Sequence, residues 1–256
     1  MECPPEKELR PLFLPGNRSV LILAGLLAMA AHSDHPRAAA PAAAPAGQVA
    51  DINAKFLDPA LDAEDWASKF ELESREVFAA REAIAEALQL EPGSRVADVG
   101  SGTGAFLHTF AEAVGPTGRV YAVDISPRFI DFLRQRVQTE KLANVAVLLS
   151  AANSTSLPVG SVSHVFVCDT YHHFEQHHEM LASIHAALVP GGRFVIVDFE
   201  RIPGVSSEWT LNHVRAGKET VRKEVEAAGF NFDREITVPE FKENYLFRFR
   251  KPAAAG

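Results

Sequence analysis

Apolar and polar residues alternate with two different periods from about residue 64 to the C-terminus. Short β-branched runs predict strands, and longer stretches with apolar residues at helical spacing predict helices. The predicted strands are 95–99, 119–123, 145–149, 162–168, 193–199, 235–238 and 245–250. The predicted helices are 105–114, 127–141, 179–188 and 218–228, preceded by one interrupted helix or two helices over 64–90.

This order of elements predicts an α/β fold. Strands that alternate with helices form a parallel sheet covered on both faces, with right-handed crossovers. The short connection between the last two strands instead predicts an antiparallel pair at one edge. We therefore expect a doubly wound, seven-stranded, mostly parallel sheet. Its first and fourth strands should flank the switch point beyond which ligands bind.

The first fifty residues differ from the rest in composition. Lys7, Arg10 and Arg18 precede an apolar run over 19–31, which has the length of a signal-peptide core and is short for a membrane span. Residues 32–50 are rich in Ala and Pro and predict a linker. We expect a signal peptide or N-terminal anchor over 1–31 and one folded domain over 51–251. That organisation predicts an exported, periplasmic or membrane-anchored protein, touching a membrane only through an uncleaved N-terminal segment, and leaves a cytoplasmic location open.

Charge narrows the class of partner. The chain has a net charge of -8 and a pI near 5.7, and it carries no long basic stripe. These properties argue against nucleic acid and favour a small-molecule partner. Beyond the N-terminal segment the chain has a single cysteine, Cys168, so no internal disulfide framework is expected.

The segment 98–104 reads Asp-Val-Gly-Ser-Gly-Thr-Gly between a predicted strand and a predicted helix. Glycines let a backbone approach a ligand closely, and the N-terminus of a helix offers free N–H groups. Gly100, Gly102 and Ala105 fit a nicotinamide fingerprint. Asp98 and Gly104 fit a site for S-adenosylmethionine, whose sulfonium and ammonium groups attract a carboxylate that a pyrophosphate would repel. The turn alone leaves both cofactors open.

Three further features favour S-adenosylmethionine. Asp124 ends the second strand, residues 188–192 read Leu-Val-Pro-Gly-Gly before the fifth, and two strands close the chain. Together with segment 98–104, these features resemble the Rossmann-like class I S-adenosylmethionine-dependent methyltransferases over about residues 71–251. They look most like the small-molecule enzymes, such as those of quinone biosynthesis. The resemblance implies S-adenosylmethionine as cofactor and methyl transfer to a small-molecule acceptor. A non-catalytic S-adenosylmethionine-binding protein and a nicotinamide oxidoreductase are the alternatives.

The resemblance also implies a cofactor site. Its residues would be Asp98, Gly100, Gly102, Gly104, Asp124, Ile125, Asn153 and Asp169. Asp98 would receive the methionine ammonium, and Asp124 would accept two hydrogen bonds from the ribose, unless it serves only as a negative charge at a helix N-terminus. Ile125 would pack on the adenine. Asn153 replaces an acidic residue common in the family, and its amide oxygen can still accept a hydrogen bond.

The loop after the fourth strand holds the candidate chemistry. His172 and His173 are candidate bases because imidazole titrates near neutrality, although either could simply pack on the following helix. Asp169 at the strand end is a candidate for contact with cofactor or acceptor, and Tyr171 for contact with the acceptor.

A second group of candidates lies between the fifth strand and the last helix. His213 and Arg215 could bind an anionic acceptor there, with the guanidinium as a fork. Alternatively, Arg215 pairs with Glu219 on a surface helix. In the N-terminal helices, Trp66 and Phe70 fit either a core or a lid over the acceptor.

The histidine-rich segment 172–179 raises the possibility of a metal site. Histidine and glutamate side chains crowd into residues 172–179, and such groups bind zinc. Their spacing matches no closed structural site, so we expect no metal from this segment.

Overall fold

The computed structural model describes residues 52–72 and 75–254. The predicted signal peptide or anchor and the predicted linker lie outside these residues. The strands are β1 (Arg95–Val99), β2 (Arg119–Asp124), β3 (Val145–Leu149), β4 (Val162–Cys168), β5 (Leu188–Phe199), β6 (Asn231–Glu235) and β7 (Asn244–Arg250). The helices are α1 (Ala54–Leu57), α2 (Ala63–Phe70), α3 (Glu76–Ala79), α4 (Arg81–Leu88), α5 (Leu107–Val114), α6 (Pro127–Thr139), α7 (His177–Ala187), α8 (Glu208–His213) and α9 (Lys218–Ala227), with a 3-10 turn at Tyr171–His173.

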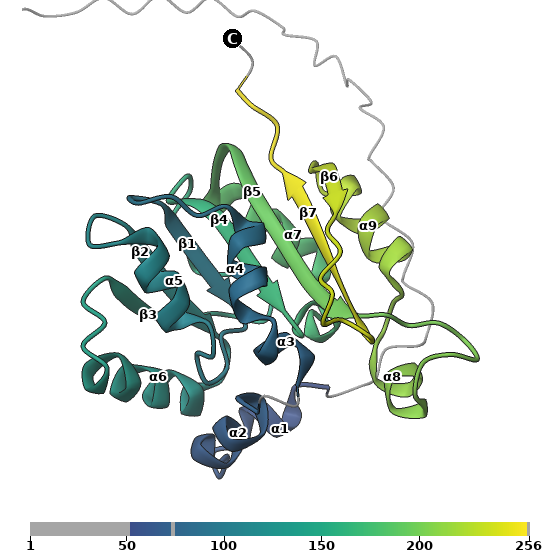
Figure 1. The fold of residues 1–256 in the computed structure, drawn as a ribbon, viewed down its shortest axis with the longest axis horizontal. Coiled ribbons are helices and arrows are strands. Elements are labelled where there is room, and N and C mark those ends of the chain that lie inside the picture. The colour runs from purple at the N-terminus through teal and green to yellow at the C-terminus, as the bar shows by residue number, and fades with distance from the viewer. Residues whose placement is uncertain (1–51, 73–74, 255–256) are drawn as a thin grey trace, which may run out of the picture. The chain divides into compact units, whose positions relative to one another are not determined.

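The strands form one seven-stranded sheet in the order β3-β2-β1-β4-β5-β7-β6 (Figure 1). β1 to β5 pair in parallel, whereas β7 runs antiparallel to both β5 and β6. The predicted fold class is confirmed, and β1 lies beside β4 as expected at the switch point.

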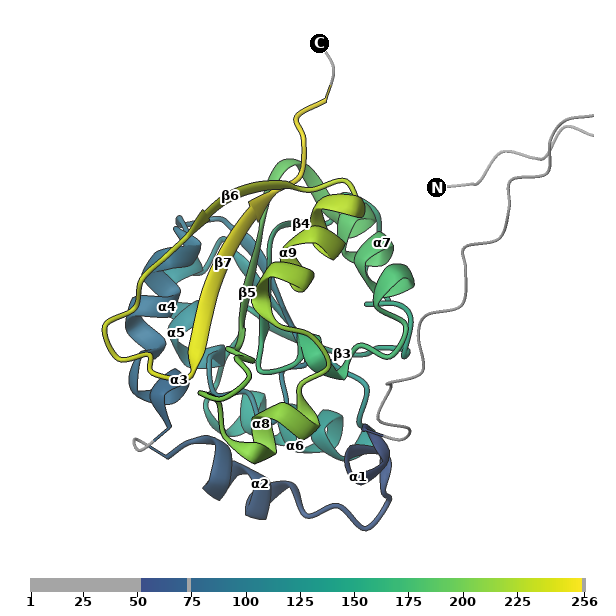
Figure 2. The same ribbon diagram turned by 90° about the vertical axis from the view of Figure 1, so that its right-hand side faces the viewer.

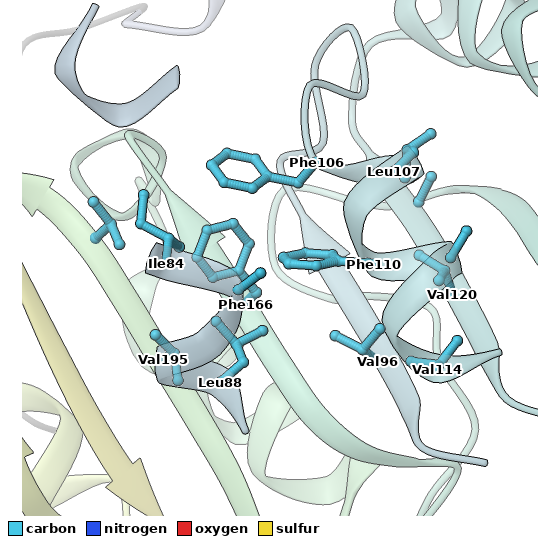
Figure 3. Packing of buried hydrophobic residues seen from close by; sticks show 14 of the residues in the cluster. Ile84, Leu88, Val96, Phe106, Leu107, Phe110, Val114, Val120, Phe166 and Val195 are labelled. Carbon is cyan, nitrogen blue, oxygen red and sulfur yellow. The ribbon is translucent and has the colours of Figure 1, made fainter. Parts of the chain in front are cut away.

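Helices cover both faces of the sheet. α4 and α5 lie on one face and α7 and α9 on the other (Figure 2). On the first face, Phe166 of β4 packs edge-on against Phe110 of α5, with ring centroids 5.2 Å apart (Figure 3). Both rings are fully buried, and burying such a side chain contributes about 1.5–3 kcal/mol. This packing holds the glycine turn, which joins β1 to α5, on a rigid base.

Several predicted bounds differ from the structure. β6 occupies 231–235 instead of 235–238, and β5 begins at Leu188 instead of residue 193. Residues 54–57, for which no element was predicted, form α1. β6 contains mostly polar residues, which an edge strand tolerates because it pairs on one side only. Residues 235–238 contain more β-branched side chains and therefore gave the stronger strand signal, but only Val238 among them is buried.

The carboxyl ends of the parallel strands meet α1, α2 and α8. In Figure 1 the arrowheads of β4 and β5 point toward the end of the domain where these helices lie. Residues from both ends of the domain's sequence therefore close over the edge where a doubly wound sheet binds ligands. Across residues 52–72 and 75–254, no helix is both long and apolar enough to cross a membrane.

Candidate active site

A cavity of about 850 Å³, its open mouth included, lies beyond the carboxyl ends of β1, β2 and β4. This volume is in the range of small-molecule sites. Six of the predicted cofactor residues line it: Asp98, Gly100, Gly102, Asp124, Ile125 and Asp169. His173 also lines it, so the structure brings most of the predicted site together.

The three glycines of the turn all have positive φ, but each meets different neighbours. A Cβ on Gly100 would lie 2.2 Å from Thr170 Cγ2. A Cβ on Gly104 would lie 2.7 Å from side-chain carbons of Leu107 and Leu133. Gly100 therefore allows close packing against the loop after β4, and Gly104, which does not line the cavity, allows packing of α5 and α6.

Asp98 lies buried at the end of β1. Its carboxylate accepts a hydrogen bond from Ser101 Oγ at 2.9 Å. Burial disfavours the charged form and raises the pKa of Asp98 to about 7, although the Ser101 bond partly opposes the shift. A cationic group bound in the cavity would favour the ionised carboxylate.

Asp124 connects the glycine turn to α6. One carboxylate oxygen accepts from the N–H of Gly102 and the other from the N–H of Ser126, each at 2.8 Å. Burial raises the pKa of Asp124 to about 6 against the pull of these bonds. The N–H of Ile125 also interacts with this carboxylate. A carboxylate has about four acceptor sites, so it can hold the turn in place and still accept from a ligand hydroxyl.

The N-terminal helices form one wall of the cavity. Phe56 of α1 and Phe70 of α2 line it, and Asn53 donates to the backbone oxygen of His173 at 3.0 Å. Trp66 packs between these rings, 5.2 Å from Phe56 and 5.1 Å from Phe70. Phe70 thus belongs both to a small apolar cluster and to the cavity wall, and the core and lid interpretations of this residue are compatible.

Asp169 has a left-handed backbone, with φ of 47°, and two side-chain partners. Its carboxylate accepts from Arg75 on one oxygen and from Asn244 at 2.8 Å on the other. Burial raises the pKa of Asp169 to about 6, while the positive charge of Arg75 counteracts the shift. These contacts fix the start of the loop that carries the histidines.

His172 and His173 have different environments. His172 is buried, and its Nδ1 is 2.7 Å from Oδ1 of Asp198. The other carboxylate oxygen, Oδ2, accepts from the backbone N–H of His172 at 3.0 Å. Asp198 favours the imidazolium and raises the pKa of His172, although burial opposes this. His173 faces the cavity, where burial and its histidine neighbours lower its pKa to about 2, so it is neutral.

Tyr171 and Arg215 do not line the cavity. Tyr171 is 1% exposed, and its hydroxyl donates to the carboxylate of Glu224 at 2.8 Å. Arg215 donates two hydrogen bonds, of 2.8 and 2.7 Å, to the same carboxylate. The predicted pairing of Arg215 with Glu219 is corrected to Glu224, which lies on the buried side of α9. Because both side chains are committed to this network, we do not retain them as acceptor contacts.

Two other predicted residues also lie apart from the cavity lining. Asn153 is exposed on the loop after β3, and His213 lies against His172 and His173 instead of lining the cavity. The role of Asn153 stays a prediction.

Sequence reasoning missed Arg75, Asn53 and Phe56. All three precede β1 and reach the site only through tertiary contacts. No local motif marks them. The only available signal was that Arg75 and Asn53 are polar residues next to apolar helical positions.

Comparison with known proteins agrees with this geometry. Residues 96–192 match the methyltransferase domain family. A ubiquinone/menaquinone biosynthesis C-methyltransferase from Ectopseudomonas mendocina is 31% identical over 45% of this chain and 45% of its own length. An uncharacterized 37.1 kDa protein in a Streptomyces fradiae transposon is 35% identical over 43% of this chain and 32% of its own length. The chain thus spans half or less of the length of these curated relatives.

A solved structure extends the comparison to the whole domain. A SAM-dependent methyltransferase from Aquifex aeolicus superposes with a TM-score of 0.66 at 23% identity, over 74% of this chain and 98% of that one. The fold and the glycine turn define a class I S-adenosylmethionine-dependent methyltransferase domain. Residues 96–192 match the methyltransferase domain family, and the glycine turn and cavity fit S-adenosylmethionine as the cofactor.

Proposed function

We propose that this protein transfers the methyl group of S-adenosylmethionine to a small, largely apolar acceptor. The observation that carries the proposal is the pair of buried carboxylates in the cavity lining, Asp98 at the glycine turn and Asp124 at the end of β2. Each has a raised pKa, so each gains from a ligand that brings positive charge or hydrogen-bond donors. S-adenosylmethionine brings an ammonium, a sulfonium and a ribose diol.

Asp98 argues against a nicotinamide cofactor. It lines the cavity at the glycine turn, and a dinucleotide bound there would place its pyrophosphate against this turn, where a buried carboxylate repels it. In our assignment Asp98 receives the ammonium and Asp124 the ribose hydroxyls. Ile125, which also lines the cavity, packs on the adenine.

The composition of the wall supports an apolar acceptor. Phe56, Phe70 and Phe129 line the cavity, and Arg215, the side chain best suited to an anionic acceptor, is bound to Glu224. Curated relatives named for menaquinone and ubiquinone biosynthesis are consistent with a small aromatic acceptor.

The chemistry asks little of the protein beyond positioning. The acceptor atom attacks the methyl carbon in line, the carbon–sulfur bond breaks, and its electron pair stays on sulfur. When the acceptor atom carries a proton, a neighbouring base takes it. His173 at the cavity wall is neutral and can accept a hydrogen bond from the acceptor, but its lowered pKa makes it a weak base. His172 behind it is fixed by Asp198.

Calorimetry followed by a transfer assay tests the proposal. S-adenosylmethionine and its demethylated product should bind, and NAD should not. Transfer of labelled methyl should then be detected on members of a panel of phenols, hydroquinones and apolar amines. Binding of NAD without S-adenosylmethionine would refute the proposal. Binding of S-adenosylmethionine with no transfer across the panel would favour the non-catalytic alternative.

We also propose that residues 1–31 export or anchor the domain. The support is the basic and then apolar order of that segment, followed by the Ala- and Pro-rich residues 32–50. N-terminal sequencing after cell fractionation should find a chain cleaved near residue 31 outside the cytoplasm, or an intact chain in the membrane fraction. An intact chain in the cytoplasmic fraction would contradict both forms.

A further inference from the structure

Three histidines gather beside the cofactor cavity. His172 and His173 come from the turn after β4, and His213 comes from the end of α8. The ring centroids of His172 and His173 are 4.3 Å apart, and each lies 5.2 Å from that of His213. One nitrogen of each ring lies within 4.8 Å of a nitrogen on the other two.

We propose that His172, His173 and His213 bind one divalent metal ion of the zinc type, with its remaining coordination position free for the acceptor. A tetrahedral zinc ion with bonds of about 2.0–2.1 Å holds its nitrogens about 3.4 Å apart. The present nitrogens lie within 4.8 Å of one another, so a bound ion would draw them together by roughly 1 Å. Three histidines and one open position are the ligand set of a catalytic zinc site.

The hydrogen bonds of the cluster suit ligands. Nδ1 of His172 bonds to Asp198. In the neutral ring this bond places the proton on Nδ1 and leaves a lone pair on Nε2 for an ion, which competes with a proton for that position. A carboxylate behind a ligating histidine fixes the tautomer and orients the ring. Nδ1 of His173 is buried without a hydrogen-bond partner, which is costly for a polar atom unless something binds there.

Aromatic side chains hold the rings in place. Trp209 stacks on His213 with centroids 4.6 Å apart, and Phe56 meets His173 edge-on at 5.4 Å. These contacts restrict the rotamers of the two rings and limit access of water, as the shell around a metal site does.

Nearby charges also favour a cation. The carboxylate of Asp198, 2.7 Å from Nδ1 of His172, and that of Asp169 at the start of the same loop place negative charge near the cluster. Lys55 opposes them, but its side chain is exposed on α1, with the ammonium over the rings of Phe56 and Trp66, so solvent screens it.

The position of the cluster gives the ion a role that rests on the proposed function. Because His173 lines the cavity, an acceptor hydroxyl in the cavity could reach the open position. A bound ion lowers the pKa of such a hydroxyl. The hydroxyl proton leaves to water, the oxygen attacks the methyl carbon, and the sulfonium becomes a neutral thioether.

The first experiment titrates the metal-free full chain with Co²⁺ and follows its visible absorption, then displaces Co²⁺ with Zn²⁺. We expect one equivalent of Co²⁺ in a low-symmetry, tetrahedral-type spectrum. Asp198→Asn should weaken Co²⁺ affinity by about 10–100-fold, as the loss of a carboxylate that orients a ligating histidine does. His213→Ala removes a ligand itself and should weaken the affinity by at least as much. His178→Ala is the matched control, because His178 is an exposed histidine in the first turn of α7, outside the cluster.

Calorimetry with S-adenosylmethionine accompanies each titration and separates the two proposals. His213 does not line the cavity, so His213→Ala should keep cofactor affinity and a cooperative thermal transition. No Co²⁺ spectrum in the wild-type chain, or the same spectrum and affinity in His213→Ala, would overturn the metal site while leaving cofactor binding intact. Loss of S-adenosylmethionine binding by the wild-type chain would instead refute the proposed function.

Discussion

At the residue scale, two glycines with the same backbone conformation differ in what a side chain would meet. Gly100 of the glycine turn and Gly204 in the loop after β5 share a φ of 78°, yet a Cβ on Gly204 would meet nothing within 4 Å. A Cβ on Gly100 would overlap the side chain of Thr170. The pair therefore separates the cost of a left-handed backbone from the cost of a collision.

Gly100→Ala should lower the free energy of unfolding by more than Gly204→Ala does. The backbone conformation alone costs about 1–2 kcal/mol in each variant. The collision with Thr170 should add about 1–3 kcal/mol in Gly100→Ala, because the packed loop after β4 must shift. Urea unfolding of both variants measures the difference. Equal losses would mean that the loop moves away freely.

Asp124→Ala should weaken the affinity for S-adenosylmethionine by about 1.5–3 kcal/mol, or about 10- to 150-fold, because charge-assisted hydrogen bonds are lost. Calorimetry measures this change. Asp131→Ala is the matched control, since Asp131 is an exposed carboxylate on α6 whose partner is Arg134. An unchanged affinity in Asp124→Ala would remove the ribose contact from our assignment.

At the scale of elements, the N-terminal helices are the part of the site that should open most easily. α1 and α2 pack through a small cluster in which Leu61, Ala63 and Phe129 are buried, apart from the two main cores. The number of apolar contacts under a segment sets how easily it opens. A cofactor in the cavity would add contacts to Phe56 and Phe70 on the side that lines the cavity.

Hydrogen exchange should therefore slow across residues 52–72 when S-adenosylmethionine binds. The segment gains contacts in the complex, so its opening free energy rises. α9 serves as the internal reference, because no residue of 218–227 lines the cavity. Equal changes in the two segments, or none in 52–72, would show that the N-terminal helices do not cover the cofactor.

The elements were predictable because each carries a local pattern. β1, β2, β4 and α6 follow from their apolar periods, and Pro127 begins α6 directly after its capping residue Ser126. β6 was misplaced because its pairing with β7 decides its position, and Asn231–Glu235 has little apolar pattern of its own.

The candidate site was predictable only for residues whose proximity follows from the order of the strands in the sheet. Asp98 and Asp124 end adjacent parallel strands, so their proximity follows from topology. Arg75 reaches Asp169 across 94 positions of sequence, and His213 reaches His172 from a separate helix. Contacts of this kind depend on loop paths, for which the sequence carries no periodic signal.

At the scale of the whole molecule, the chain carries a net charge of -8 and buries carboxylates in its cavity. Burial raises the pKa of Asp98 to about 7 and that of Asp124 to about 6 from an ordinary value of 3.8. A raised pKa stabilises the fold at low pH, and this stability is lost as the pH rises through the folded-state value. Ionising the two groups thus destabilises the ligand-free cavity as the pH rises from about 4 to about 7.

S-adenosylmethionine should show the opposite pH dependence, because its ammonium and ribose favour the ionised carboxylates. Between pH 7.5 and pH 6, protonation of Asp98 and Asp124 should weaken binding by about tenfold in total, while the ligand's amino group stays largely protonated. Calorimetry across this range, in buffers of different ionisation enthalpy, should also detect protons released on binding. Asp98→Asn removes the group with the higher pKa, so its profile should be nearly flat above pH 6.5. An affinity that rises as the pH falls would mean that neither carboxylate meets the cofactor in its ionised form.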